Sequence, residues 1–165
     1  LDDDDRDFLQ YASLIHEVGL TFAHSQHHVH GAYIVENSDL PGFSRRDQQR
    51  LSILVRCHRR TVDMAQLASL SAADAIRTRW LITLLRIAVT LHRTRSTEQL
   101  PGLQVQVDGS EFNLCFPPGW LQAHPLTRAD LKEERDRLKA LGVKLKVGAR
   151  SESRAAGNVL SGALI

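Results

Sequence analysis

The chain has 165 residues, the size of one ordinary domain or of one and a half domains. Hydrophobic residues make up 42% and charged residues 24% of it, close to the averages of soluble globular proteins, which excludes a disordered or fibrous chain. No apolar run approaches the roughly 18 to 20 residues of a membrane span, and residues 1–7 lack the basic and apolar pattern of a secretory signal. Because Cys57 and Cys115 are too few for a disulfide framework, we expect a protein of the reducing cytoplasm.

The net charge of +2 conceals an uneven distribution of charge along the chain. Residues 1–7 contain five acidic side chains and one basic side chain, and we expect them to form an acidic linker. From Arg45 to Arg95 there are eleven arginines, no lysine and three acids, a net charge of +8. The planar guanidinium group suits phosphate oxygens, so this segment favours a polyanionic partner. The alternative interpretation is a solvated helix surface.

Residues 8–98 are expected to form a helical domain, because apolar residues recur there with the helical period. The spacing predicts helices over 7–20 and over about 28–37. Ser44 and Ser71, each followed three residues later by a carboxylate, are typical N-caps and predict the starts of two more helices. The residues expected to be buried on the third helix are Leu51, Leu54, Val55 and His58. Those expected on the last and longest helix are Ile76, Trp80, Leu84, Ile87, Ala88 and Leu91.

Residues 99–148 are expected to form a small α+β module. Apolar and polar residues alternate on both sides of the Asp108-Gly109 turn, which predicts a β-hairpin. Thr127 is typical of an N-cap and Gly142 of a helix end, so we expect a helix between them and a third strand over 143–147.

The predicted fold class is therefore mainly α, with a helical domain followed by a small module of a β-hairpin, a helix and a strand. Residues 149–165 are small and polar and are expected to form a flexible tail.

Histidine is concentrated in one short segment, since five of the eight histidines lie between residues 16 and 30. The adjacent pair His16 and Glu17 offers two metal-ligand types, but its spacing does not match that of a zinc-protease helix. The alternative is that the loop histidines bond to the backbone and that His16 is a satisfied core residue.

Several motifs in this order resemble the C-terminal half of exopolyphosphatases and guanosine pentaphosphate phosphohydrolases. The motifs are HEVG at 16–19, HVHGAY at 28–33, NSDLPGF at 37–43, VRCHRR at 55–60, LLRIAV at 84–89 and FPPGW at 116–120. The similarity covers roughly residues 8–147, and so long a run in one order is far more specific than any single motif.

The resemblance implies a four-domain parent protein. In that family, phosphoanhydride hydrolysis resides between two N-terminal actin-like lobes, which supply a catalytic glutamate, glycine-rich phosphate loops and Mg²⁺. This sequence has no such loops, so we expect it to correspond to the third and fourth domains only and carry over no catalytic residue. Mg²⁺ is expected for the full-length enzyme and no cofactor for this chain.

The third domain of the family resembles the HD superfamily of metal-dependent phosphohydrolases. Here the His-Asp pair of that superfamily is replaced by His16 and Glu17, and Val89 stands where a later aspartate is needed. Since valine cannot bind a metal, we do not expect an HD metal site, and His16 and Glu17 are weak metal candidates only. An independent HD-type phosphohydrolase acting on guanosine tetra- or pentaphosphate, or on other nucleotides, is the alternative function.

Polyphosphate binding is the function that the resemblance and the arginine-rich segment favour together. The family's C-terminal domains are thought to line a channel for the polyphosphate chain, often across a homodimer, and an arginine-rich surface concentrates such polyanions. Lys144 and Lys146 lack paired exposed aromatics beside them, so we do not expect nucleic-acid binding. The candidate polyphosphate-binding residues are Arg56, His58, Arg59, Arg60, His24, His28, His30 and Arg93.

Overall fold

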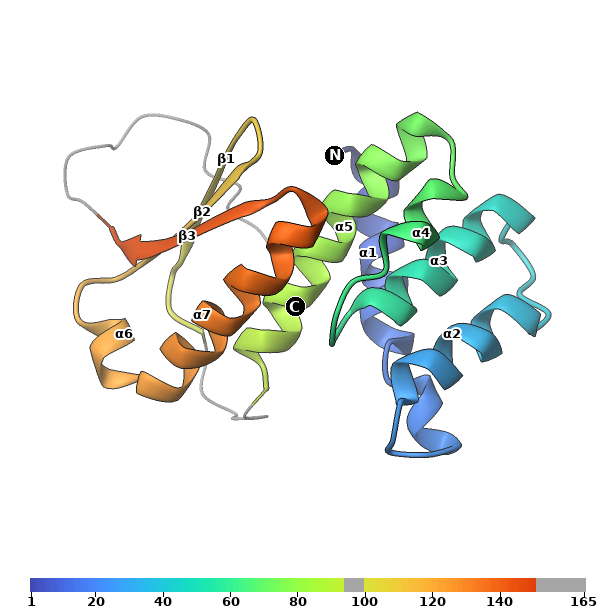
Figure 1. Cartoon of the computed structure of the whole chain (residues 1–165), viewed down its shortest axis with the longest axis horizontal. Helices are drawn as coiled ribbons and strands as arrows, with labels where there is room; N and C mark the ends of the chain where they lie inside the picture. The colour runs from blue at the N-terminus through green and yellow to red at the C-terminus, as the bar shows by residue number, and fades with distance from the viewer. Residues whose placement is uncertain (94–99, 151–165) are drawn as a thin grey trace. The chain divides into compact units, whose positions relative to one another are not determined.

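The computed structural model describes residues 1–93 and 100–150 (Figure 1). The chain divides into two compact units, Leu1–Arg86 and Ile87–Ile165, which we call unit 1 and unit 2. Helices are followed by a small mixed sheet, which confirms the predicted fold class. Within the described ranges no helix is long and apolar enough to cross a membrane. Residues 151–165 of the predicted flexible tail lie outside the described residues. Arg95, at the end of the arginine-rich segment, lies outside them as well.

Unit 1 is built from helices whose starts follow the capping residues of the sequence. Its elements are α1 (Asp3–Ile15), a 3-10 turn η1 (Val18–Thr21), α2 (His27–Asn37), α3 (Arg45–Cys57), α4 (Met64–Ala68) and the greater part of α5 (Ala72–Leu91). The hydroxyl of Ser44 accepts from the Asp47 amide, and that of Ser71 accepts from the Asp74 amide, each at 3.2 Å. Both predicted N-caps are therefore confirmed.

The acidic N-terminus is part of α1, where the sequence had led us to expect a linker. Asp2 is the N-cap, and its side chain and that of Asp5 form a reciprocal capping box. Arg77 of α5 donates to Asp2 at 2.6 Å and to Asp5 at 2.7 Å. Carboxylates are favourable at a helix N-terminus, and with an arginine to neutralise them they start a helix.

Helices α2 and α3 lie side by side and form the core of unit 1 (Figure 1). Leu51, Leu54 and Val55 of α3 are at most 1% exposed, as the periodicity predicts. Gln48 of α3 connects the two helices, because its Nε2 donates to the Val35 carbonyl near the C-terminus of α2 at 2.7 Å. Such a bond satisfies a carbonyl that the helix end leaves without an intrahelical partner.

The predicted buried stripe of α5 is confirmed at Ile87 and Leu91, whereas Trp80, Leu84 and Ala88 are only half-buried. Ile76 is 56% exposed, and the buried side chains of that part of the helix include Asp74, Thr78 and Leu81. Apolar residues surround most of this helix, so their period does not define one face. The polar side chains of Asp74 and Thr78 were not counted in the stripe, although both lie in the core.

Unit 2 contains a three-stranded sheet in the order β1-β2-β3. Its elements after α5 are β1 (Gln104–Asp108), β2 (Glu111–Phe116), α6 (Trp120–Ala123), α7 (Pro125–Leu138), a 3-10 turn η2 (Lys139–Leu141) and β3 (Lys144–Ala149). Strands β1 and β2 form the predicted antiparallel hairpin, with Val107 opposite Phe112, and β3 is parallel to β2. Helix α7 packs against β3.

Helix α7 begins earlier than predicted. Its N-cap is His124 and its first residue is Pro125, upstream of the predicted cap Thr127. Proline is favourable there because its fixed φ matches the helix and its missing N–H is not needed. Gly142 ends the following turn with φ of 68°, as expected for a glycine C-cap.

Candidate functional site

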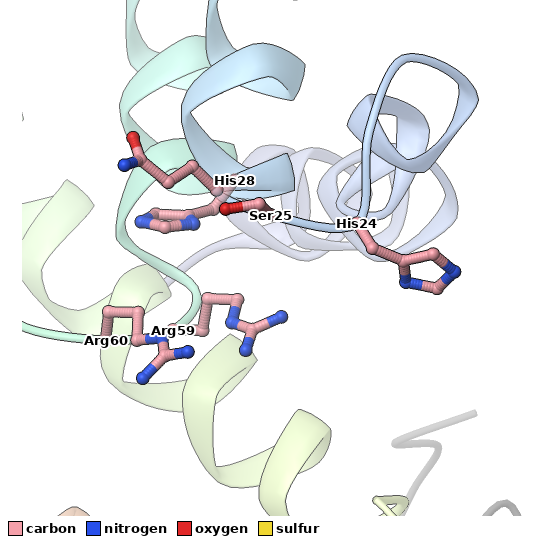
Figure 2. A pocket seen from close by; sticks show the side chains of 6 residues that line it. His24, Ser25, His28, Arg59 and Arg60 are labelled. Carbon is pink, nitrogen blue, oxygen red and sulfur yellow. The ribbon is translucent and has the colours of Figure 1, made fainter.

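A pocket of about 420 Å³ lies in unit 1 at the N-terminus of α2 and the turn that follows α3 (Figure 2). None of its lining residues is acidic and two are arginines, and we call it the basic pocket. Its lining residues are His24, Ser25, Gln26, His28, Arg59 and Arg60. In Figure 2 the guanidinium groups of Arg59 and Arg60 lie across from the imidazole of His28, while His24 extends to the side.

The backbone of the basic pocket is unusual on both sides. Gln26, with φ of 51°, and Arg60, with φ of 60°, are the non-glycine residues with positive φ in the part of the chain that the structure describes. A left-handed conformation costs a non-glycine residue roughly 1 to 2 kcal/mol, and such residues cluster at functional sites. Gln26 is the N-cap of α2 but makes no side-chain cap, so the first amide groups of the helix keep hydrogen-bonding capacity at this end.

Arg86 of α5 holds the turn that carries the two pocket arginines. Its side chain is 1% exposed and donates to the Cys57 carbonyl at 2.5 Å and to the Arg60 carbonyl at 2.8 Å. Cys57 is the last residue of α3, so the cation also meets the negative end of the helix dipole. The Arg86 guanidinium therefore fixes the backbone from which Arg59 and Arg60 project.

Three histidines form a cluster behind the basic pocket. The ring of His58 lies 5.1 Å from that of His16 and 5.6 Å from that of His27. The Nδ1 atom of each ring bonds to a backbone carbonyl, and a carbonyl only accepts, so each Nδ1 carries the proton. The accepting carbonyls belong to Ser13 for His16 (2.6 Å), His24 for His27 (3.2 Å) and Val55 for His58 (2.6 Å).

The cluster meets the pocket through Arg59 and His28. With Nδ1 of His27 protonated, Nε2 is free to accept, and Nη1 of Arg59 lies 3.1 Å from it. The ring of His28 lies 6.3 Å from that of His27 and 6.4 Å from that of His58. Its Nδ1 is buried and, unlike those of the other three, has no hydrogen-bond partner within the described structure.

Burial lowers the pKa of three imidazoles of this region, those of His27, His28 and His58. Desolvation is the largest cause in each case, lowering the pKa of His58 to about 3 and that of His28 to about 4. It also lowers the pKa of His27, with Arg59 acting in the same direction. Arg59 and Arg60 carry permanent positive charges in the basic pocket, and no carboxylate in the described ranges forms an ion pair with Arg60.

The structure brings together four of the eight candidate residues, His24, His28, Arg59 and Arg60. The others lie elsewhere. His58 is 3% exposed behind the pocket, and Arg56 is a half-buried residue of α3. His30 packs against Phe22 with ring centroids 4.7 Å apart. Arg93, in unit 2, donates to Asp130 at 2.7 Å.

Sequence reasoning missed three residues of this site, Ser25, Gln26 and Arg86. Ser25 and Gln26 stand between histidines that were singled out, so their position was the available signal. The signal for Arg86 was a lone cation inside the apolar run from Trp80 to Leu91, which is typical of a buried arginine with carbonyl partners.

Within residues 1–93 and 100–150, no group of three or more His, Cys, Asp or Glu side chains is arranged to hold a metal ion. The Nδ1 atom of His16 is engaged by Ser13, and Glu17 also interacts with neighbouring groups.

Comparison with known proteins matches the chain to one family. Residues 1–135 match the family described as Ppx/GppA phosphatase, domain III. The chain is 35% identical over 133 residues to a guanosine-5'-triphosphate,3'-diphosphate pyrophosphatase of Pseudoalteromonas translucida (strain TAC 125). The aligned segment covers 81% of this chain and 27% of that relative, so the chain spans less than a third of the relative's length.

Proposed function

The chain belongs to the Ppx/GppA phosphatase family, and we propose that its basic pocket binds phosphate groups of a phosphoanhydride substrate. The observation that carries this proposal is the pairing of Arg59 and Arg60 in one pocket that no acidic residue lines. Guanidinium groups bind phosphate oxygens through charge-assisted hydrogen bonds, which are about twice as strong as neutral ones. We propose that hydrolysis itself takes place in catalytic lobes outside this chain, and we assign no catalytic residue within it.

Inorganic polyphosphate is the substrate class that we propose first. The lining of the basic pocket offers two guanidinium groups for phosphate oxygens and no acidic side chain, so its charge favours a chain of phosphates. The parent enzyme then releases terminal phosphate from polyphosphate while this region holds the chain. The family relative named above favours guanosine pentaphosphate as the second candidate, and the same two arginines would bind its phosphates.

The test is a calorimetric titration of this chain with long-chain polyphosphate, tripolyphosphate and guanosine pentaphosphate at low and at physiological salt. We expect polyphosphate to bind with an affinity that falls steeply with salt, because phosphate contacts release counterions. Replacing Arg59 and Arg60 by alanine should remove most of the binding heat. Arg6→Ala, an exposed arginine of α1 without a carboxylate partner in the described structure, is the matched control and should bind like the wild type.

Binding that persists unchanged in the Arg59→Ala, Arg60→Ala double variant would move the phosphate site away from the basic pocket. Tighter binding of guanosine pentaphosphate than of tripolyphosphate would favour the second substrate.

Three further properties of the parent protein belong to the same proposal. We place Mg²⁺ in the catalytic lobes, so this chain alone should release no phosphate from polyphosphate or from guanosine tetra- or pentaphosphate, with or without added metal. Phosphate release by the isolated chain would support the alternative of an independent HD-type phosphohydrolase. We also propose a cytoplasmic homodimer, which sedimentation equilibrium would detect as a doubled mass.

A further inference from the structure

His28 is the one member of the histidine group whose buried Nδ1 lacks a partner. In His16, His27 and His58 the same atom is bonded to a backbone carbonyl, whereas in His28 it has no hydrogen-bond partner in the described structure. A buried polar atom without a partner is costly and calls for an explanation in a native structure. His28 also lines the basic pocket, so a ligand bound there lies beside this ring.

We propose that the basic pocket binds a proton together with a doubly charged oxyanion, and that His28 is the group that takes up the proton. The proposal rests on the function proposed above and deepens it, since it specifies how the same pocket responds to pH. The oxyanion supplies an acceptor for an imidazolium N–H and a negative charge beside the ring.

The charged groups that act most strongly on His28 are cations, while the carboxylate of Glu17 acts on the neighbouring His27. Arg59 and Arg60 approach from the turn after α3, Arg56 from α3 itself, and the neutral rings of His27 and His58 lie against it. Burial and these arginines lower the pKa of His28 to about 4, so the free protein holds the ring neutral at pH 7. A dianion bound between Arg59 and Arg60 cancels the repulsion from their guanidinium groups.

The expected coupling follows from linkage. An opposite charge within about 4 to 6 Å raises the pKa of a cationic acid by roughly 1 to 3 units. With a rise of about 2 units, the bound state takes up its proton near pH 6, and the affinity for the dianion increases about tenfold between about pH 8 and about pH 5. Above about pH 7 the ring is neutral in both states and the affinity no longer depends on it.

Sulfate is the probe for the experiment, because it remains doubly charged over this pH range and takes up no proton itself. The carbon-bound ring protons of the eight histidines are followed by NMR from about pH 8 to pH 4, in sulfate and in chloride of equal ionic strength. His28→Gln assigns the His28 signal, and His92→Gln, which replaces an exposed histidine of α5's C-terminal end, is the matched control.

We expect sulfate to raise the pKa of His28 and to leave the pKa values of the other histidine rings nearly unchanged. We also expect the tenfold gain in sulfate affinity at low pH to vanish in His28→Gln and to persist in His92→Gln. Sulfate binding with an unchanged His28 titration would overturn this inference and leave the proposed function intact. If neither sulfate nor tripolyphosphate binds at any pH, the proposed function fails and the inference fails with it. The pKa values themselves are read on the wild-type chain, and His28→Gln serves to assign the signal and to test the gain in affinity.

Discussion

Replacing Arg86 by methionine is expected to damage both the stability of unit 1 and phosphate binding. The side chain is buried and its guanidinium donates to the carbonyls of Cys57 and Arg60. A hydrogen bond from a charged donor contributes roughly 1.5 to 3 kcal/mol, and a carbonyl left without a partner in the core costs a similar amount. Losing both bonds is therefore expected to lower the free energy of unfolding by about 3 to 5 kcal/mol.

Arg86→Lys separates the contribution of charge from that of geometry. An ammonium group keeps the buried cation but lacks the planar fork that spans two carbonyls, so we expect about half of the loss. Urea unfolding followed by circular dichroism measures the free energy, and tripolyphosphate calorimetry on the folded lysine variant measures the effect on the pocket. Arg79→Met, on the same helix, is the control for loss of one arginine and should cost less than about 1 kcal/mol. A loss below about 1 kcal/mol in Arg86→Met, with unchanged binding, would refute this account of the turn.

Three other perturbations probe the surroundings of the pocket. Because burial lowers the pKa of His58 to about 3 while its unfolded value is near 6.5, this ring alone should lower the free energy of unfolding by about 2.5 kcal/mol between pH 7 and pH 4.5. The lowered pKa of His28 adds to the fall, so urea titrations at the two pH values should show a loss of at least that size, and a flat profile would contradict the buried neutral rings. Gly19→Ala places a methyl group against the His27 carbonyl oxygen and should cost about 1 to 3 kcal/mol in thermal unfolding, whereas an unchanged melting temperature would exclude this close approach. Arg77→Ala removes the nearer of the two arginines paired with Asp5, the other being Arg50 at 3.7 Å, and should increase amide hydrogen exchange in α1 without changing that in α7. Equal exchange in α1 before and after the change would show that the N-terminus is held by other contacts.

Much of the fold could be predicted because its local signals agree with its tertiary packing. The hydroxyl caps at Ser44 and Ser71 and the alternation around the Asp108-Gly109 turn each specify their element by short-range chemistry. The α1 helix was missed at its start because five acids in seven residues resemble a solvated linker. Their helical role depends on Arg77, seventy-two positions after Asp5 in the chain, which no local pattern reveals.

The candidate site could be predicted in part. The motifs around His28 and Arg59 identified the two segments, and the structure brings residues of both into one pocket. The reach of each side chain was not predictable, because it depends on helix packing and on the left-handed turn at Arg60. His58 belongs to the same motif as Arg59, yet its side chain is buried in the core, where its ring bonds to the Val55 carbonyl. These two neighbouring residues therefore point in different directions, His58 into the core and Arg59 into the basic pocket.

The most direct test of the central claim is an amide NMR titration of this chain with tripolyphosphate at low salt. If the basic pocket binds phosphate groups, the largest shift changes should fall on residues 24–28 and 57–60, the two segments that meet at the pocket. They should disappear in the Arg59→Ala, Arg60→Ala double variant. Shifts confined to the basic residues of unit 2, such as Lys144 and Lys146, or no shifts at all, would contradict the claim.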